Sequence, residues 1–459
     1  MGGTDLPGVL DTSPATSRYR LGAVTDMLIH ARRARFLVVF GLSLTLLGCG
    51  AQAPPTQAPS GAPGSPSAGP LATGPTPSDG SPAASPTGSD GLAATPSPEP
   101  TADHRVEDAL AALDTDEELV GQLLLVGWSG TSAEGAQQAI DRLRPGGVVF
   151  IANASRAERA TAINLGLEGL ADAAGIIPLL KAIDHEGGAV QRIEDVTNVG
   201  SNLEFASNGA TEGNACERGA THARQLREMG FDANLAPVLD VNTNPDNPVI
   251  GDRSYGSDPR LVARLGSAYV RGLQAGGILA VGKHFPGHGD TSVDSHLGLP
   301  VLDFGRGRLN DVELVPFKRA IAPETRIAAI MTAHIALPRI DPSGLPATLS
   351  QPILTGILRD QLGYEGLVIS DDTAAMAAIT DGFEPGEAAI MAIGAGVDML
   401  IIGGDLDRQV LMRDALIQAL GSGALSRDRV VEAARHVLSA KARFGVLGDQ
   451  LDPEPGCEG

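Results

Sequence analysis

The sequence predicts an α/β fold, a (β/α)8 barrel of the TIM type, and three observations lead to that prediction. Eight short runs after residue 103 are nearly continuous in Val, Ile, Leu and Ala, as parallel strands buried on both faces are. The segments between the runs leave room for a crossover helix each time. Six of the runs end at or beside a polar residue, as strands that share one rim of a barrel do. A doubly wound open sheet is the competing architecture.

Composition and charge exclude several classes of protein. Among 459 residues, Asp and Glu number 55 against 34 Lys and Arg, which gives a formal net charge of −21. A surface that binds phosphate backbones must be basic, so we expect no nucleic-acid partner. The three cysteines are too few for a disulfide-dense scaffold, and none pairs with another at zinc-ligand spacing. We also expect that the protein needs no cofactor and that it is a monomer.

Residues 1–49 have the pattern of a secretory signal. A basic segment that ends at Arg35 precedes the apolar run Phe36–Leu47, which is too short to span a membrane. The sequence Leu-Leu-Gly-Cys that ends at Cys49 resembles a bacterial lipobox, which implies that Cys49 carries a lipid and becomes the mature N-terminus. We therefore expect an extracytoplasmic protein, anchored by lipid to the outer face of the bacterial cytoplasmic membrane. A short anchor that is not cleaved is the alternative.

Three further segments follow. Residues 50–103 consist of Pro, Ser, Ala, Gly and Thr with almost no large apolar side chain, so they cannot offset their ordering entropy and we expect a disordered tether. Residues 104–448 carry the predicted barrel, and residues 449–459 form a short tail.

The predicted strands and one helix can be placed directly. Ser426 can cap a C-terminal helix, whose buried stripe carries Val430, Ala434, Val437 and Lys441, and Gly445 ends it. The eight predicted strands cover residues 122–127, 147–152, 179–184, 234–240, 278–284, 328–334, 366–371 and 398–403.

Polar side chains at the strand ends indicate an enzyme. In a barrel these ends share the rim on which the loops build the active site, and a coincidence over most of the strands exceeds what loop solvation alone requires. The polar residues at these ends are Asn153, Asp184, Asp240, Lys283 with His284, His334, and Asp371 with Asp372.

The segment 283–296 after the fifth strand concentrates the chemistry. It reads Lys-His-Phe-Pro-Gly-His-Gly-Asp-Thr-Ser-Val-Asp-Ser-His, and its Gly and Pro residues forbid a helix. Asp294 and His296 are two residues apart, so a tight loop lets the carboxylate accept a hydrogen bond from the imidazole. Such a pair fixes the tautomer and suits the histidine to general acid/base catalysis.

A metal site is the alternative for this loop. Zinc or manganese binds imidazole and carboxylate ligands, although no His-Glu-x-x-His motif accompanies them here. The candidate ligands are His284, His288, Asp290, Asp294 and His296.

Four motifs in order resemble those of family 3 β-N-acetylglucosaminidases that process peptidoglycan. Besides the loop 283–296, these motifs are Asp184-His185-Glu186-Gly187-Gly188 with Arg192, Gly251-Asp252-Arg253-Ser254, and Ser370-Asp371-Asp372. The resemblance covers residues 105–445. It implies a (β/α)8 barrel and retaining hydrolysis of terminal, non-reducing β-linked N-acetylglucosamine through a covalent glycosyl-aspartate intermediate.

The resemblance also implies a role for individual residues. Asp371 resembles the family nucleophile, His296 its acid/base and Asp294 the partner of that histidine. Lys283 and Arg253 are expected to keep Asp371 ionised. Asp372 is expected to be structural. The residues that match positions binding the sugar hydroxyls and N-acetyl group are Asp184, Arg192, Arg253, Lys283 and His284.

The sequence departs from the family pattern at His185, Ala189 and Thr373, where Gln, Arg and Leu are commoner. Because none of these is an expected reacting group, the departures affect the details of the sugar subsite. Larger members carry a second α/β domain after the barrel, which we do not expect here.

Several alternatives stay open at this point. A metal-dependent barrel hydrolase, a lipoprotein that captures solute for a transporter, and a plain β-glucosidase are the rival functions. A histidine acid/base is neutral after it gives up its proton, so phosphate would not be repelled and phosphorolysis could accompany hydrolysis. Cys216 and Cys457 could form a disulfide or stay as thiols.

Overall fold

The computed structural model describes residues 104–448 and 456–457. The predicted signal segment 1–49 with its lipid-attachment residue Cys49, the predicted tether 50–103 and the remainder of the tail 449–459 lie outside these residues. In the part of the chain that is described, no helix has the length and apolar character needed to cross a membrane.

Eight parallel strands form one sheet that closes into a barrel. The strand order is β7-β6-β5-β4-β3-β2-β1-β8, and a parallel bridge between Ile369 and Met399 joins its two ends. Closure excludes the doubly wound alternative, which would keep two free edges, and confirms the barrel prediction. The strands are β1 (Leu124–Val126), β2 (Gly147–Phe150), β3 (Leu180–Ile183), β4 (Ala233–Asn234), β5 (Leu279–Phe285), β6 (Ala329–Thr332), β7 (Leu367–Ile369) and β8 (Leu400–Ile402).

Strand β4 differs most from the prediction, which placed a strand over residues 234–240. Pro237 has no N–H group and cannot continue a sheet ladder, so the regular strand ends at Asn234. The chain still runs beside β5, where Val238 pairs with Lys283 and the Leu239 amide donates to the Lys283 carbonyl at 2.5 Å.

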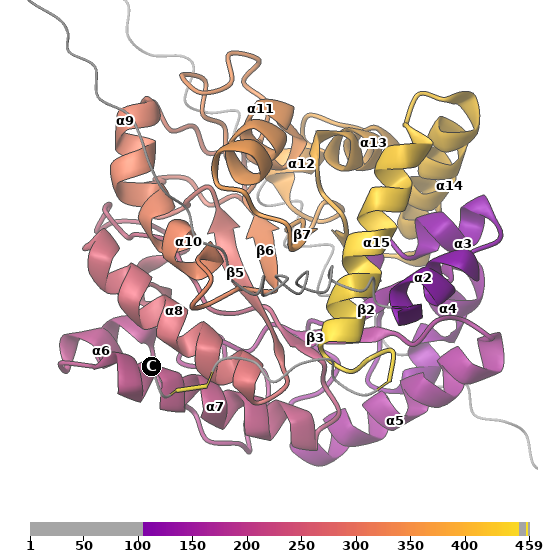
Figure 1. Cartoon of the computed structure of the whole chain (residues 1–459), viewed down its shortest axis with the longest axis horizontal. Helices are drawn as coiled ribbons and strands as arrows, with labels where there is room; N and C mark the ends of the chain where they lie inside the picture. Colours follow the sequence, from indigo (N-terminus) through magenta and orange to yellow (C-terminus); the bar gives the residue numbers. More distant parts are fainter. Residues whose placement is uncertain (1–103, 449–455, 458–459) are drawn as a thin grey trace, which may run out of the picture. The chain divides into compact units, whose positions relative to one another are not determined.

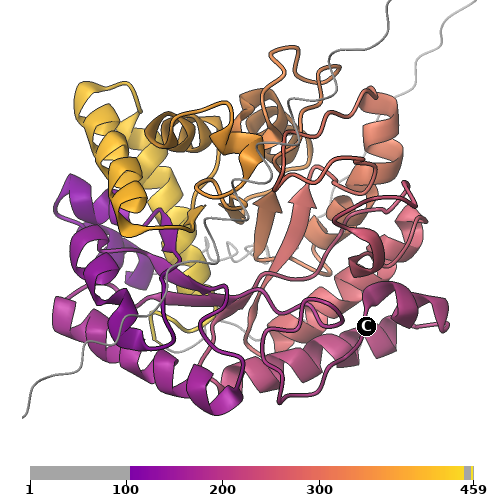
Figure 2. The same cartoon turned by 180° about the vertical axis from the view of Figure 1, so that it is seen from behind.

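Helices surround the strands, as Figures 1 and 2 show from the two sides. They are α2 (His104–Ala111), α3 (Asp116–Gly121), α4 (Gln137–Leu143), α5 (Ala157–Ala174), α6 (Asn202–Ser207), α7 (Glu212–Glu228), α8 (Pro259–Ala275), α9 (Arg306–Arg308), α10 (Leu314–Ile321), α11 (Gln351–Ile353), α12 (Ala377–Thr380), α13 (Pro385–Ala395), α14 (Leu406–Ser422) and α15 (Arg427–Arg443). Short 3₁₀ or π segments are η2 (Ala133–Ala136), η3 (Gly251–Arg253), η4 (Leu309–Glu313), η5 (Ala347–Leu349) and η6 (Leu354–Gln361).

The predicted C-terminal helix is α15. Ser426 stands at its N-cap position, although its side chain makes no capping hydrogen bond, and Gly445 follows with a φ of 77°. All four residues of the predicted stripe are buried, which confirms the face of the helix that packs on the barrel.

Alternate strand residues pack on opposite sides of the barrel wall. In β1, Leu125 belongs to the cluster that fills the barrel, while Leu124 and Val126 pack in the larger cluster that includes the helices. Val149 and Val148 divide in the same way in β2. This two-residue alternation explains the continuous apolar runs, because both faces of every strand are buried.

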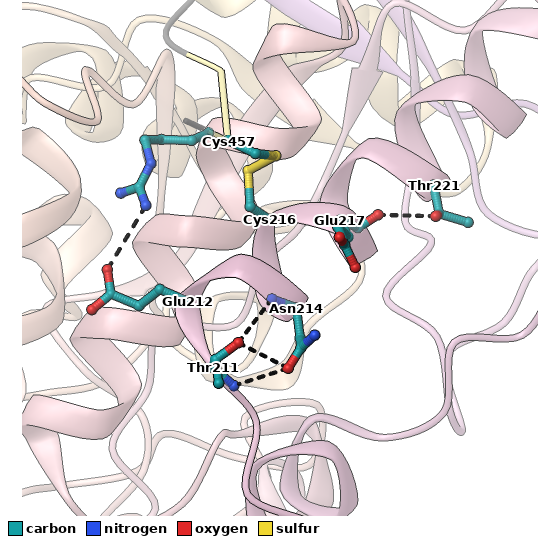
Figure 3. The surroundings of a disulfide bond; sticks show 8 residues. Thr211, Glu212, Asn214, Cys216, Glu217, Thr221 and Cys457 are labelled. Carbon is teal, nitrogen blue, oxygen red and sulfur yellow. Dashed lines mark hydrogen bonds and ion pairs between the residues drawn. A yellow bond between two sulfur atoms is a disulfide. The ribbon is translucent and has the colours of Figure 1, made fainter. Parts of the chain in front are cut away.

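A disulfide joins Cys216 of α7 to Cys457, with the two Cα atoms 5.5 Å apart (Figure 3). The two cysteines are separated by 241 residues in the sequence. Thus the structure pairs the cysteines whose state the sequence left open, and it ties the end of the chain to the first turns of α7.

Candidate active site

A cavity of about 430 Å³ opens at the carboxyl ends of the strands. Its wall includes the residues expected to bind the sugar, namely Asp184, Arg192, Arg253, Lys283 and His284, together with the expected catalytic residues His296 and Asp371. The structure therefore brings together residues that lie far apart in the sequence. The eighth expected residue, Asp294, contacts the site through His296.

A network of charged side chains forms one side of the cavity. The Lys283 ammonium lies 2.6 Å from Asp184 Oδ1 and 2.7 Å from Glu186 Oε1. Arg253 binds both oxygens of Glu186, at 2.7 and 3.0 Å, and Arg192 lies 3.1 Å from Asp184 Oδ2. Two carboxylates thus orient three cations, which is the arrangement needed to present fixed donors and acceptors to hydroxyl groups.

The network keeps its members ionised despite burial. Burial works to raise the pKa of Glu186, but the charges of Lys283 and Arg253 and their hydrogen bonds hold it well below its ordinary value. Burial likewise works to lower the pKa of Lys283, and the carboxylates of Asp184 and Glu186 outweigh it and raise that pKa. A charged, hydrogen-bonded cluster of this kind is rigid before any ligand arrives.

Asp371 follows strand β7 and faces the cavity as a carboxylate. Burial works to raise its pKa, but the imidazoles of His334 and His284, a hydrogen bond from the Asp372 amide and the Lys283 charge lower it below the ordinary value. The amide donates to Asp371 Oδ1 at 2.8 Å. The expected influence of Lys283 is therefore present, whereas the two imidazoles act where Arg253 was expected to.

His296 and Asp294 form the hydrogen-bonded pair that their spacing predicted. His296 Nδ1 lies 2.7 Å from Asp294 Oδ1, which also accepts the His296 amide at 2.9 Å. Burial works to raise the pKa of Asp294, and the hydrogen bonds from His296 lower it below the ordinary value. Because the carboxylate accepts the hydrogen bond of Nδ1–H, Nε2 is left for proton transfer, and 62% of the side chain is exposed.

The other polar residues at strand ends support loops. Asp240 is fully buried, accepts the His288 amide at 2.6 Å and holds His284 Nδ1 at 2.7 Å. His334 contacts Thr348 and the Asp372 carbonyl, and the Asn153 amide donates to two carbonyls of the loop after β1. These contacts keep the rim in shape around the cavity.

The structure does not support the metal-site alternative. Within residues 104–448 and 456–457, no three His, Cys, Asp or Glu side chains converge closely enough to hold a metal ion. The five candidate ligands make other contacts instead. His288 contacts Thr291 and Ser295, and Asp290 contacts Arg308. His284 contacts Asp240, while Asp294 and His296 contact each other. Among the described residues, the metal-site alternative for this loop therefore has no support.

Residues 115–440 match the family described as glycosyl hydrolase family 3, N-terminal domain, which is most of the chain. This chain belongs to glycoside hydrolase family 3. The match covers all eight strands and every residue of the site described above.

Family 3 relatives share much of this sequence. Beta-hexosaminidase A of Pseudoalteromonas piscicida is 34% identical over 320 residues, which cover 65% of this chain and 53% of that protein. Beta-hexosaminidase LpqI of Mycobacterium tuberculosis is 32% identical over 79% of this chain and 90% of its own length. The chain thus spans about half of the first relative and most of the second.

A solved family 3 structure agrees with the fold. The glycoside hydrolase family 3 beta-N-acetylglucosaminidase from Paenibacillus sp. str. FPU-7 matches with a TM-score of 0.71 and 40% identity. The match covers 74% of this chain and 64% of that one.

Glu186 is the residue that reasoning from the sequence missed. Its side chain is 3% exposed and contacts two of the residues expected to bind the sugar. Its place two residues after Asp184, inside a quoted family 3 motif, was the available signal.

His185, one of the departures from the family pattern, supports the loop that carries Arg192. It is buried, and its Nδ1 atom accepts the amides of Arg192 and Ile193 at 3.2 and 3.4 Å. Thr373 is buried as well and donates to the Ile401 carbonyl at 3.0 Å. Both departures therefore act behind the cavity wall.

Proposed function

We propose that this family 3 protein is a retaining exo-β-N-acetylhexosaminidase that removes terminal, non-reducing N-acetylglucosamine from peptidoglycan fragments. The single observation that carries the proposal is that Asp371 and the His296–Asp294 pair meet at one cavity with the sugar-binding residues. The names of the relatives support the choice of sugar.

The proposed reaction has two displacements. In the first, an Asp371 carboxylate oxygen bonds to the anomeric carbon while the glycosidic carbon–oxygen bond breaks, and the His296 Nε2 proton passes to the leaving oxygen. In the second, water gives a proton to the same nitrogen and its oxygen bonds to the anomeric carbon, which releases Asp371. Asp294 stabilises the imidazolium that is present before the first step and after the second.

The charged network would hold the sugar during both steps. Asp184 accepts hydrogen bonds from hydroxyl groups, and Lys283, His284, Arg192 and Arg253 donate to hydroxyls and to the N-acetyl oxygen. Because the network is rigid, the sugar is placed without reordering of these side chains, which lowers the entropic part of the barrier.

Nitrophenyl glycosides test the reaction. The wild type should release nitrophenol from the β-linked N-acetylglucosaminide and not from the glucoside, and Asp371→Ala should lose at least about 10³-fold in kcat. Azide should restore release in Asp371→Ala and give the α-glycosyl azide, whereas in His296→Ala it should give the β-glycosyl azide. Release from the glucoside alone would favour a β-glucosidase. A kcat of Asp371→Ala close to that of the wild type without azide would refute the nucleophile.

The natural substrate needs a second assay. Disaccharides of N-acetylglucosamine linked to N-acetylmuramic acid, with and without a stem peptide, should release free N-acetylglucosamine. Millimolar phosphate tests the phosphorolytic alternative, because N-acetylglucosamine 1-phosphate would then replace the free sugar. A chelator that abolished activity would instead favour the metal-dependent hydrolase.

We further propose that the protein is a lipoprotein on the outer face of the cytoplasmic membrane, attached through Cys49. The signal and tether pattern of the sequence supports this location. Expressed in a bacterium that lipidates such signals, the wild type should enter the detergent phase on phase separation, and Cys49→Ala should stay in the aqueous phase. Equal partition of the two proteins would refute lipid attachment.

A further inference from the structure

Asp372, the carboxylate beside the proposed nucleophile, binds the backbone of its own loop. One oxygen, Oδ1, accepts the amides of Ala374, Ala375 and Gly403 at 2.9, 3.2 and 3.1 Å. The other oxygen lies against Gly403, where an added Cβ atom would overlap it. Asp372 thus fastens the loop after β7 to the end of β8.

Two more contacts fasten the same loop to β8 and α14. The Thr373 hydroxyl and amide both donate to the Ile401 carbonyl, at 3.0 and 3.1 Å. The guanidinium of Arg408 donates to the Ala374 carbonyl. The loop between Asp371 and α12 is therefore a fixed structure built around Asp372.

This loop in turn holds the segment that carries the acid/base. The first amides of a helix have no partner inside the helix. At the start of α12, the amide of Ala378 donates to the Ser295 carbonyl at 3.1 Å, and that of Ala377 to the His296 carbonyl at 3.4 Å. The position of His296 relative to Asp371 therefore depends on the loop that Asp372 organises.

We propose that Asp372 is a positioning residue, which sets the nucleophile Asp371 and the acid/base His296 in register by fixing the loop between β7 and α12. The inference rests on the proposed function. The residues expected to hold the sugar belong to β5, η3 and the loop after β3, whereas Asp372, which also lines the cavity, belongs to the loop after β7.

The test compares kcat and KM of three variants with the wild type, on the nitrophenyl N-acetylglucosaminide and on an unactivated disaccharide. In Asp372→Ala, kcat should fall about 100-fold while KM changes little, since misplacement of reacting groups by about 1 Å costs this much. The loss should be greater on the disaccharide, whose leaving group needs the acid. Asp372→Asn should recover most of the loss, because an amide oxygen still accepts the three amides.

Gly403→Ala tests the contact between Asp372 and Gly403 by changing Gly403 instead of Asp372. The added methyl displaces Asp372 while the carboxylate itself is kept, so its kcat should fall as in Asp372→Ala. Gly421→Ala is the matched control, because a Cβ atom at Gly421 meets no neighbour, and its kinetics should equal those of the wild type. Thermal unfolding of each variant shows whether the barrel is intact.

Each other outcome has a definite meaning. A wild-type kcat in Asp372→Ala, or a rise in KM with kcat unchanged, would overturn the positioning role. An Asp372→Asn variant as impaired as Asp372→Ala would overturn it too, because the negative charge itself would then be required. Azide should not rescue Asp372→Ala, and rescue with formation of the α-glycosyl azide would make Asp372 the nucleophile. An inactive wild type would instead refute the proposed function.

Discussion

The proposed role of Asp371 as nucleophile requires a carboxylate, and its surroundings favour that form. Burial alone would favour the neutral acid, so the imidazoles of His334 and His284 and the Lys283 charge have to outweigh it. The result is a pKa below the ordinary value of aspartate. The same surroundings would be lost if the loop after β7 moved, which connects the ionisation of Asp371 to its placement.

A pH profile follows from this lowered pKa. A depressed pKa means that Asp371 stays ionised until the pH falls through a value below the ordinary one of about 3.9. We therefore expect kcat/KM for the nitrophenyl substrate to show no loss from the nucleophile above about pH 5. An acidic limb centred above pH 5 and kept in His296→Ala would contradict this expectation.

Glu186 is predicted to be essential for the charged network. In Glu186→Gln, Lys283 and Arg253 lose a buried counter-charge, and such a loss costs about 3–5 kcal/mol in the free energy of unfolding. Glu168→Gln is the matched control, since Glu168 also lies 2.7 Å from a lysine but is half exposed, and its effect should stay below about 1 kcal/mol. Denaturant unfolding measures both, and equal effects of the two substitutions would contradict the prediction.

At the scale of elements, most strands of the barrel can be predicted from the sequence. Seven of the eight strands share three or more residues with the predicted runs, because burial on both faces leaves an uninterrupted apolar signal. Strand β4 is the exception, since Pro237 interrupts the ladder but not the apolar run. The stripe of α15 was predicted by its helical spacing, which its packing on the barrel requires.

Lys441 on α15 predicts a pH dependence of stability. It is fully buried with a hydrogen bond to Gln122, and burial lowers its pKa to about 7. The unfolded chain has the ordinary value of about 10.4, so between these values it binds more protons than the folded chain and stability rises with pH. Protonation of the buried Lys441 amine destabilises the folded chain, and this destabilisation is complete below about pH 7.

The test is Lys441→Met, which removes this titration. The free energy of unfolding of the wild type should increase relative to that of the variant as the pH rises from 7 to 10, by at most about 1.4 kcal/mol per pH unit. Urea unfolding of both proteins at several pH values measures the difference. A difference that is independent of pH would show that Lys441 has an ordinary pKa in the folded protein.

At the scale of the whole molecule, the disulfide closes a loop that contains most of the barrel. Cys216 and Cys457 are 241 residues apart, and a cross-link of this kind restricts the unfolded chain far more than the folded one. Figure 3 shows the bond at α7, and neither cysteine is among the residues that line the active-site cavity.

Cys457→Ala should therefore lower stability without changing catalysis. In a Cys49→Ser background, we expect a loss of about 2–4 kcal/mol in the free energy of unfolding, and kcat and KM equal to those of the parent. Reductant should produce the same loss in the parent and none in the variant. Two reactive thiols in the unreduced, unfolded parent would contradict the disulfide.

The sequence by itself determined the fold class and the family, and it predicted seven residues that line the cavity. Local patterns carry this information, because a buried strand must be apolar and the candidate side chains stand at strand ends or on the loops that follow them. The Asp294–His296 pair was predictable for the same reason, since both residues belong to one tight loop.

Only the tertiary structure decided how distant segments meet. Glu186 became part of the site because β3, β5 and η3 bring Lys283 and Arg253 to it, and Asp372 gained its role from contacts with β8. The cysteine pair likewise depends on where the chain end lies beside α7. These interactions join residues dozens to hundreds of positions apart. The spacing of residues along the chain does not indicate such contacts, because they form only when the barrel closes.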